Sequence, residues 1–196
     1  MSPKQQRGAA TAAQILDRAL EIYAADGEAG LTVGALTAAS GVSAGSVYHH
    51  FGSLPGVLAA LAQRWLGRLL EELVAELGKV TDARSGVHAV VRVYLRFVQT
   101  HPDASRLMHS APVDREGMAR AAQLRGSQEA RLAPLAAWLR GRQAAGELAA
   151  LPLPVLESLI LGPVTALARR WLTLGDIDLD TAIEQTPERI WRSVSP

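Results

Sequence analysis

Three residues, Gly41-Val42-Ser43, separate two short helical segments, and this spacing limits the fold more than any other feature of the sequence. Gly41 allows the left-handed backbone that ends the first segment, and Ser43 is suited to cap the N–H groups that begin the second. Val42 is apolar and is expected to fill the wedge between the two helices. The pattern therefore predicts a helix-turn-helix, in which two short helices pack beside a third.

The preceding residues supply that third helix. From Thr11 to Ala25 the apolar residues recur at helical spacing along one stripe, and Asp26-Gly27 is predicted to end the helix. Thr32 is the predicted N-cap of the next, short helix.

The rest of the chain also favours helix, because alanine, leucine and arginine are abundant while β-branched and aromatic residues are sparse. We expect an all-α fold of about nine helices. Its parts are an N-terminal three-helix domain over residues 1–51, a connecting helix over about 53–78, and a C-terminal helical domain over 79–196 that begins with a polar break at 79–86. The later helices are predicted over residues 87–100, 103–110, 116–145 (kinked or broken at Pro134), 153–174 (interrupted at Gly162-Pro163) and 179–194.

Composition excludes several classes of function. The chain of 196 residues has no cysteine, so it forms neither disulfides nor Cys-ligated metal centres. It has neither the apolar core of a signal peptide nor a membrane span, and we expect a cytoplasmic protein. No catalytic set converges in the sequence, so we predict no enzymatic activity, no cofactor and no metal.

The second helix of the helix-turn-helix has features suited to DNA. Small residues at its start let its N-terminus approach base edges, while a phenol and an imidazole follow that can donate to phosphates. The free N–H groups after Thr32 offer a second phosphate anchor, and the first eight residues are interpreted as a flexible basic arm. The predicted DNA-binding residues are Lys4, Arg7, Thr32, Ser43, Ala44, Gly45, Ser46, Tyr48 and His49.

This segment resembles the DNA-binding segment of the TetR family of bacterial regulators. The resemblance lies in Leu31-Thr32-Val33 and in the run LTAASGVSAGSVYHHF over residues 36–51, and it extends over about residues 10–66. Residues 143–148 are similar to the family's turn between helices 7 and 8. The resemblance implies a homodimer that binds operator DNA and is released by a small-molecule effector. It also implies that Thr32, Ser43, Ala44, Ser46, Tyr48 and His49 contact DNA, while Val42, Val47 and Phe51 are core.

Leu54 departs from the family pattern, which usually has a lysine at this position to reach a phosphate. Residues 1–51 carry three basic side chains (Lys4, Arg7, Arg18) and four acidic ones, so this half of the chain is not basic. Because each lost phosphate contact removes counterion release, helix N-termini, hydroxyl groups and the first eight residues are expected to contribute more than usual.

The effector is expected to be mostly apolar, since the later helices supply mainly apolar walls. Each wall residue has ordinary core packing as its alternative. Arg92, Arg96, His101 and His109 are the polar groups expected to reach such a pocket. The predicted ligand-binding residues are Tyr94, Phe97, Val98, His101, Leu107, Met108, Leu124, Leu135 and Trp138.

The last two helices carry apolar stripes that we interpret as a dimer interface, because a soluble chain rarely leaves such a surface exposed. Two helices from each subunit would form a four-helix bundle about a twofold axis. The predicted interface residues are Leu156, Ile160, Val164, Leu167, Trp171, Ile183, Ile190 and Trp191.

Other interpretations remain open. Leu54 and the acidic balance also fit a helical dimer whose weakened DNA-binding domain acts through a protein partner, and a ligand-binding protein or enzyme without DNA is a third possibility. At single positions, Tyr48 is alternatively a core ring. Metal sites at His49-His50 or at His101, Asp103 and His109 are alternatives without a complete ligand set.

Overall fold

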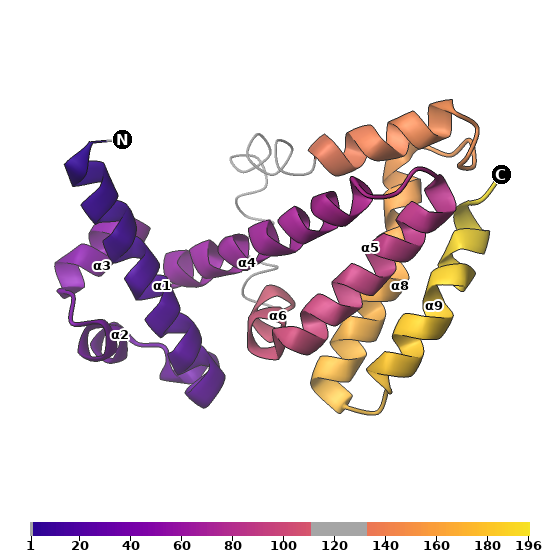
Figure 1. Cartoon of the computed structure of the whole chain (residues 1–196). Helices are drawn as coiled ribbons and strands as arrows, with labels where there is room; N and C mark the ends of the chain where they lie inside the picture. The colour runs from indigo at the N-terminus through magenta and orange to yellow at the C-terminus, as the bar shows by residue number, and fades with distance from the viewer. Residues whose placement is uncertain (1, 111–132) are drawn as a thin grey trace. The chain divides into compact units, whose positions relative to one another are not determined.

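The computed structural model describes residues 2–110 and 133–196, apart from the side chain of Lys4. The described residues form helices joined by short turns, without any strand, which confirms the predicted all-α class (Figure 1). None of the described helices is long and apolar enough to cross a membrane. The helices are α1 (Pro3–Gly30), α2 (Val33–Ser40), α3 (Ala44–Phe51), α4 (Leu54–Leu77), α5 (Ala83–Thr100), α6 (Pro102–Met108), a helix over residues 133–144, α8 (Leu153–Leu174) and α9 (Leu179–Val194).

These residues form two compact units, and the boundary falls inside α4. The first holds the described residues up to Trp65 together with residues 107–110, and the second holds Leu66–Arg106 together with residues 133–196.

The first unit is built on α1, α2 and α3, which contact one another (Figure 1). Ile15, Leu36 and Val47, one from each helix, are fully buried. Each of these helices therefore turns one apolar face inward, as the spacing of apolar residues predicts.

The N-terminus is helical, which corrects the expectation of a flexible arm. α1 begins at Pro3, directly after a capping box in which the Ser2 hydroxyl accepts from the Gln5 N–H (3.3 Å) and the Gln5 side chain accepts from the Ser2 N–H (2.8 Å). Proline is favoured at this first position because its missing N–H would have had no partner. The predicted stop at Asp26-Gly27 has a counterpart in a break of helical geometry at Gly27, whose φ is 67°.

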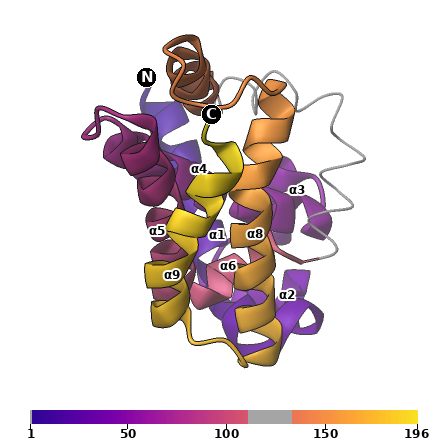
Figure 2. The same ribbon diagram turned by 90° about the vertical axis from the view of Figure 1, so that its right-hand side faces the viewer.

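The second unit has α5, α8 and α9 packed side by side (Figure 2). This packing corrects part of the predicted dimer interface. Leu156, Ile160 and Val164 are 0%, 4% and 0% exposed, and Ile183 and Ile190 are also buried within this same chain. The apolar stripe of α8 is therefore turned inward, and it leaves no free surface at these positions.

Predictions for three further helices also change: the start of α5, the interruption of α8 and the bounds of α6. α5 begins at Ala83 rather than residue 87, because Asp82 caps it by accepting from the Ser85 N–H (2.8 Å) and Glu147 accepts from the Ala83 N–H (2.7 Å). α8 continues through Gly162-Pro163 without the predicted interruption. α6 begins at Pro102, one residue before the predicted start, and ends at Met108.

A carboxylate holds α5 and α9 together at the surface. Glu188 on α9 accepts from the Arg84 guanidinium on α5 at 2.9 and 3.1 Å, and it lies 3.2 Å from His88 Nε2. The hydrogen bonds from Arg84 hold the pKa of Glu188 below its usual value. Burial, followed by the charge of Arg92, lowers the pKa of His88, so this imidazole favours its neutral form.

Gly86 on α5 has a packing role. A Cβ atom built there would lie 2.0 Å from Cζ2 and 2.3 Å from Cη2 of Trp138, which means that the indole ring occupies the space of a side chain. Gly86 is buried, and its absent side chain lets helix 133–144 approach α5 at this point.

We expect Gly86→Ala to destabilise the fold by about 1–3 kcal/mol, because overpacking forces Trp138 out of its position. Gly141→Ala is the matched control: Gly141 lies in helix 133–144 with no atom within 4 Å of an added Cβ. This control should be neutral or slightly stabilising, since alanine favours helix. Thermal unfolding followed by circular dichroism tests the pair, and equal melting temperatures for the two variants would contradict this packing role.

Candidate functional site

The turn between α2 and α3 has the geometry that its residues predict. Gly41 has a φ of 70°, and its N–H donates to the Thr37 carbonyl at 2.9 Å to close α2. Ser43 caps α3 by accepting from the Ser46 N–H at 3.2 Å. Gly41 is in the left-handed region and reverses the chain. Only two residues therefore separate this C-cap of α2 from Ala44, the first residue of α3.

The two ends of α2 are held by α1 and by Thr32. The Gln14 side chain on α1 donates to the Ser40 carbonyl at 2.8 Å, so the last turn of α2 is tied to α1. Thr32 caps α2 by accepting from the Ala35 N–H at 3.1 Å, as predicted. The starts of α2 and α3 are thus both capped by hydroxyl side chains.

The start of α3 presents small and polar residues to solvent. Ser43, Ala44 and Gly45 are exposed, and His49 is exposed at the other end of the helix. Tyr48 is 52% exposed, which excludes the alternative of a buried core ring. Val47, in contrast, is fully buried and forms the inner face of α3.

Three predictions for this helix need refinement. Ser46 is half-buried, whereas Ser43, Ala44 and Gly45 are exposed. Val42 and Phe51, expected in the core, are also half-buried. Val42 lies in the turn before α3 and Phe51 is the last residue of this helix, whereas Val47 lies in its middle.

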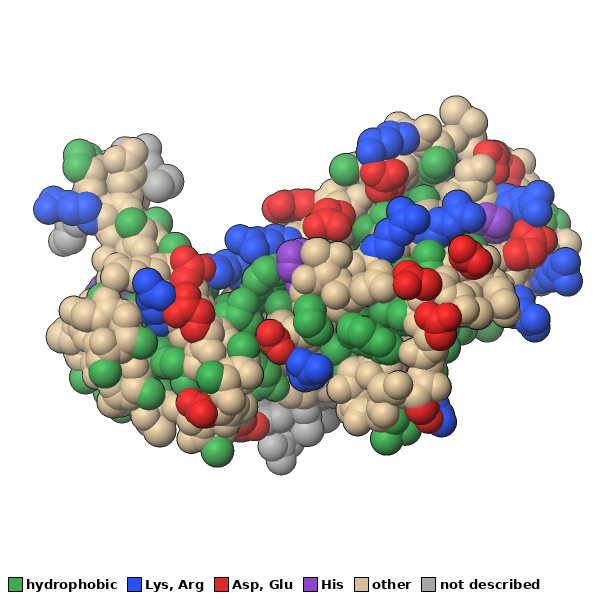
Figure 3. Space-filling model, turned by 60° about the horizontal axis from the view of Figure 1, so that its bottom comes forward, with side chains coloured by type: hydrophobic (Ala, Val, Ile, Leu, Met, Phe, Trp, Pro, Cys, Tyr) green, Lys and Arg blue, Asp and Glu red, His purple; other side chains and the backbone are tan. Residues whose placement is uncertain are grey.

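Of the arginines that the structure describes in the first unit, Arg18 and Arg64 are in ion pairs. Arg18 donates to both oxygens of Glu21 at 2.6 and 2.8 Å, and Arg64 of α4 pairs with Asp17 of α1. Arg7 is exposed and makes one long hydrogen bond to its own helix, to the Pro3 carbonyl at 3.4 Å. On the face shown in Figure 3, the α1–α3 part carries scattered basic side chains beside acidic ones, without a continuous basic surface.

The start of α4 offers N–H groups where the family pattern has a lysine. Ser53 accepts from the Gly56 N–H at 3.1 Å, and Pro55 lies in the first turn as expected. Leu54 is half-buried. A helix start attracts phosphate through its partial positive charge, which is weaker than a lysine ammonium.

The histidines do not assemble a metal site. The His49 and His50 rings stand edge to face with centroids 5.2 Å apart, and Asp103 is paired with Arg106 at 2.7 Å. Among residues 2–110 and 133–196, no three His, Asp or Glu side chains are placed to hold a metal ion.

The predicted ligand-binding residues are dispersed. Tyr94, Phe97 and Val98 are buried on α5, and burial raises the pKa of Tyr94 to about 12, so its phenol stays neutral. His101 is half-buried, with its ring 4.8 Å from that of Phe97. Leu107 and Met108 belong to the first unit, whereas the others belong to the second. Leu124 lies outside the described residues.

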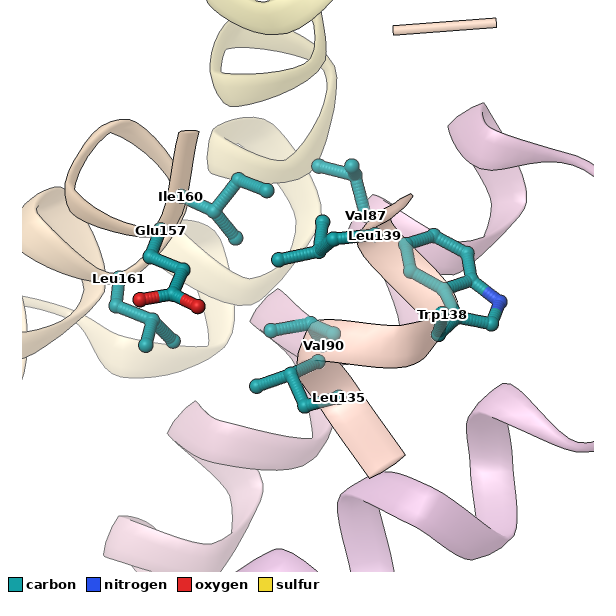
Figure 4. Close-up of a pocket in the computed structure, with 8 residues that line it drawn as sticks. All are labelled: Val87, Val90, Leu135, Trp138, Leu139, Glu157, Ile160 and Leu161. Atoms are coloured by element: carbon teal, nitrogen blue, oxygen red, sulfur yellow. The ribbon is translucent and has the colours of Figure 1, made fainter. Parts of the chain in front are cut away.

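Two of these residues do line a common pocket in the second unit. Leu135 and Trp138 meet side chains from α5 and α8 there (Figure 4). Sequence reasoning missed Glu157, although it is the single charged residue between Glu147 and Arg169. The full lining is Val87, Val90, Leu135, Trp138, Leu139, Glu157, Ile160 and Leu161.

The expected polar groups lie elsewhere. Arg92 and Arg96 line a separate groove of about 560 Å³ between the second half of α4 and α5, where Glu72 and Glu76 form the opposite wall. This groove is more polar than the pocket at Trp138, because charged side chains line both of its sides.

Comparison with known proteins identifies the helix-turn-helix. Residues 15–61, which include all of α2 and α3, match the model of bacterial regulatory proteins of the tetR family. This segment is of the TetR type. The match covers the turn at Gly41, the cap at Ser43 and the exposed Tyr48, which are the residues on which the resemblance depends.

A curated relative matches over part of its length. The HTH-type transcriptional regulator BetI of Rhizobium meliloti is 30% identical over 89 residues, which are 45% of this chain and 44% of that protein. The aligned part thus spans less than half of this TetR-family relative.

Solved structures match over nearly the whole chain. A TetR family transcription regulator from Marinobacter aquaeolei is 22% identical, with a TM-score of 0.73 and coverage of 97% of this chain and 98% of that one. FadR from Bacillus subtilis, solved in complex with stearoyl-CoA, is 17% identical, with a TM-score of 0.69 and coverage of 90% and 96%. At these identities the likeness shows a shared TetR-type fold.

We expect Tyr48→Ala and Ser46→Ala to weaken DNA binding in different ways. A phosphate contact from Tyr48 would make its loss lower affinity evenly across DNA sequences, whereas a base contact from Ser46 would make its loss relax selectivity at one position by about 1–3 kcal/mol. Binding to a library of mutated operators measures both effects. Thr173→Ala on α8 is the control, and the same change in selectivity for both variants would contradict the division of roles.

Proposed function

We propose that this protein is a homodimeric transcriptional repressor that binds operator DNA and is released by a small, mostly apolar effector. The observation that carries the proposal is the exposed start of α3, with Ser43, Ala44 and Gly45 open to solvent and Tyr48 52% exposed, within the segment that matches the family model. In this proposal residues 1–51 form the DNA-binding domain, and residues 79–196 bind the effector and the second subunit.

The proposed contacts with DNA follow from the positions of hydrogen-bond donors at the starts of α2, α3 and α4. Side chains at the start of α3 would approach base edges in the major groove, and the capped N-termini of α2 and α4 would hold phosphates. Lys4, Arg7, Thr32, Tyr48 and His49 remain our candidates for backbone contacts. Since Arg18 and Arg64 are engaged in ion pairs, Arg7 is the one arginine among the described residues of the first unit that is left to add electrostatic affinity.

A gel shift at several salt concentrations, using DNA from upstream of the protein's own gene, tests this function. Specific binding that survives excess unrelated DNA supports the proposal that the protein is a repressor. A folded dimer without specific binding would instead favour the alternative, in which the weakened DNA-binding domain acts through a protein partner. The half-buried Leu54 and the paired arginines are the observations behind that alternative.

Leu54→Lys should tighten operator binding and steepen the dependence of log affinity on log salt by about one unit, because one further phosphate contact releases about one counterion. The structure offers a matched control in Leu174→Lys, at an exposed position at the end of α8. Gel shifts at 50–300 mM salt, taken as roughly the range in which such slopes are linear, measure the operator affinity and the salt slope of each variant. An unchanged slope for Leu54→Lys would mean that this helix start does not approach DNA.

The dimer interface that we now propose uses the outer side of α8 and α9 rather than the buried stripe. A mostly apolar groove of about 630 Å³ runs there, and it includes Leu159, Pro163 and Leu167 from α8 and Ile177 from the following turn. Leu167 belonged to the predicted interface, and it is only half-buried within the chain. A twofold axis across this groove would cover it with the same groove of a second copy.

Leu167→Glu should therefore yield monomers, because it places an unpaired charge in an apolar interface. Leu174→Glu, on the same helix but 64% exposed, should remain dimeric. Analytical ultracentrifugation measures the mass, and far-UV circular dichroism checks that both variants keep their helix content. A dimeric Leu167→Glu variant with normal operator affinity would place the interface on another surface.

The effector would act through the spacing of the two recognition helices, which must lie about 34–36 Å apart to enter successive major grooves. A coupling of about 1–3 kcal/mol between effector and DNA is enough to change occupancy measurably. FadR from Bacillus subtilis, which shares this fold, was solved with stearoyl-CoA, and this supports an effector site in the second unit.

A further inference from the structure

The segment that carries most of the proposed DNA contacts has a distinctive charge composition. Residues 29–63, which include α2, the turn at Gly41, α3 and the start of α4, contain no Asp, Glu, Lys or Arg. His49 and His50 are the only side chains in this range whose charge changes between about pH 5 and pH 8. The charge of the segment is therefore set by the protonation of two neighbouring imidazoles.

Both histidines lie in the last turn of α3. His49 is exposed, next to Tyr48, whose side chain is also open to solvent. His50 is half-buried, and its ring stands edge to face with that of His49, with centroids 5.2 Å apart. A Cβ atom built at Gly8 would lie 3.8 Å from Cε1 of His50, so this ring lies against the first turns of α1. His49 is thus the ring that is open to a phosphate, and His50 lies beside it on the side of α1.

The neighbouring helices bring little other charge to these rings. α2 has no titratable side chain, and α4 has no charged residue before Arg64. On α1, Arg7 is exposed and adjacent to Gly8. The first carboxylate of that helix, Asp17, comes nine residues after Gly8, which is about 13 Å of helix rise, and it pairs with Arg64. The helices of this unit therefore offer a cation, rather than a carboxylate, near His50.

We propose that His49 and His50 bind the DNA backbone as imidazolium ions, so that the protein takes up protons when it binds and holds DNA more tightly at acidic pH. A phosphate beside an imidazole favours its protonated form, so the complex binds more protons than the free protein does. By linkage, affinity then rises as the pH falls and declines as the pH rises.

Two added charges matter in this segment because it supplies no permanent ones. Leu54 stands where the family pattern has a lysine, and each phosphate that is neutralised releases about one counterion. The inference rests on the proposed function, of which it names a mode of regulation by pH.

The test measures the affinity of the full chain for two duplexes of equal length, one from upstream of its own gene and one of unrelated sequence. Fluorescence anisotropy at fixed ionic strength should give about tenfold tighter binding at pH 6 than at pH 8, which corresponds to uptake of about half a proton averaged over this range. The slope of log affinity against log salt should be steeper by about one unit at the lower pH. Both effects should appear with both duplexes, because phosphate contacts do not depend on sequence.

Variants assign the protons. Glutamine can donate a hydrogen bond but does not titrate. His49→Gln combined with His50→Gln should therefore reduce the tenfold change to less than about twofold, and His49→Gln alone, at an exposed side chain, should reduce it to about threefold. His88→Gln, at a half-buried histidine of α5 in the second unit, is the matched control and should keep the tenfold change.

Equal wild-type affinities at the two pH values, or a tenfold change that persists in His49→Gln and in the double variant, would overturn the proposal. The wild-type series and the single variant decide the matter even if the double variant fails to fold, which circular dichroism would show. No binding of either duplex at either pH would overturn both this inference and the proposed function. Equal binding of the two duplexes, with the pH dependence intact, would count against a sequence-specific repressor and leave proton uptake supported, so the two failures are distinguishable.

Discussion

The caps of α2 and α3 are the constraint on which the first unit depends. Each helix has eight residues, and helices of this length are unstable alone in water because nucleation costs more than a few hydrogen bonds return. Thr32 and Ser43 each satisfy one free N–H, and a cap of this kind contributes about 1 kcal/mol. The remaining stability comes from burying Leu36 and Val47 against α1. Short helices leave their first N–H groups close to the surface, where an anion can reach them.

This construction explains how the unit could bind DNA although two of its described arginines are engaged in ion pairs. Arg18 pairs with Glu21 on its own helix, and Arg64 of α4 pairs with Asp17 of α1, so both arginines contribute little long-range attraction. Helix N-termini and hydroxyl groups remain as donors. Such donors act over a few ångströms and depend on geometry, so they favour a precise fit over strong general attraction.

Local features of the fold could be predicted from the sequence, because they depend on residues within one turn of each other. The left-handed Gly41, the caps at Thr32 and Ser43, and the bounds of α8 and α9 are of this kind. The helical N-terminus was also encoded locally, in Ser2 and Gln5, but the basic residues there suggested an arm instead.

Features set by distant residues could not be predicted in the same way. α5 starts early partly because Glu147, 64 positions away, accepts from its first N–H. The stripe containing Leu156 and Val164 was correctly recognised as apolar, yet periodicity does not tell whether such a stripe meets the same chain or a second one. The pocket around Trp138 likewise requires three helices to be placed in space.

Glu157 illustrates how a sequence pattern acquires meaning from structure. Within an apolar run, a lone glutamate usually marks the solvated side of a helix, and the sequence alone favours that ordinary interpretation. In the structure Glu157 is half-buried and lines the pocket at Trp138 together with Val90 of α5 and Leu135 of helix 133–144. This neighbourhood is formed by three helices that are distant in the sequence, so the spacing of residues within α8 alone could not predict it.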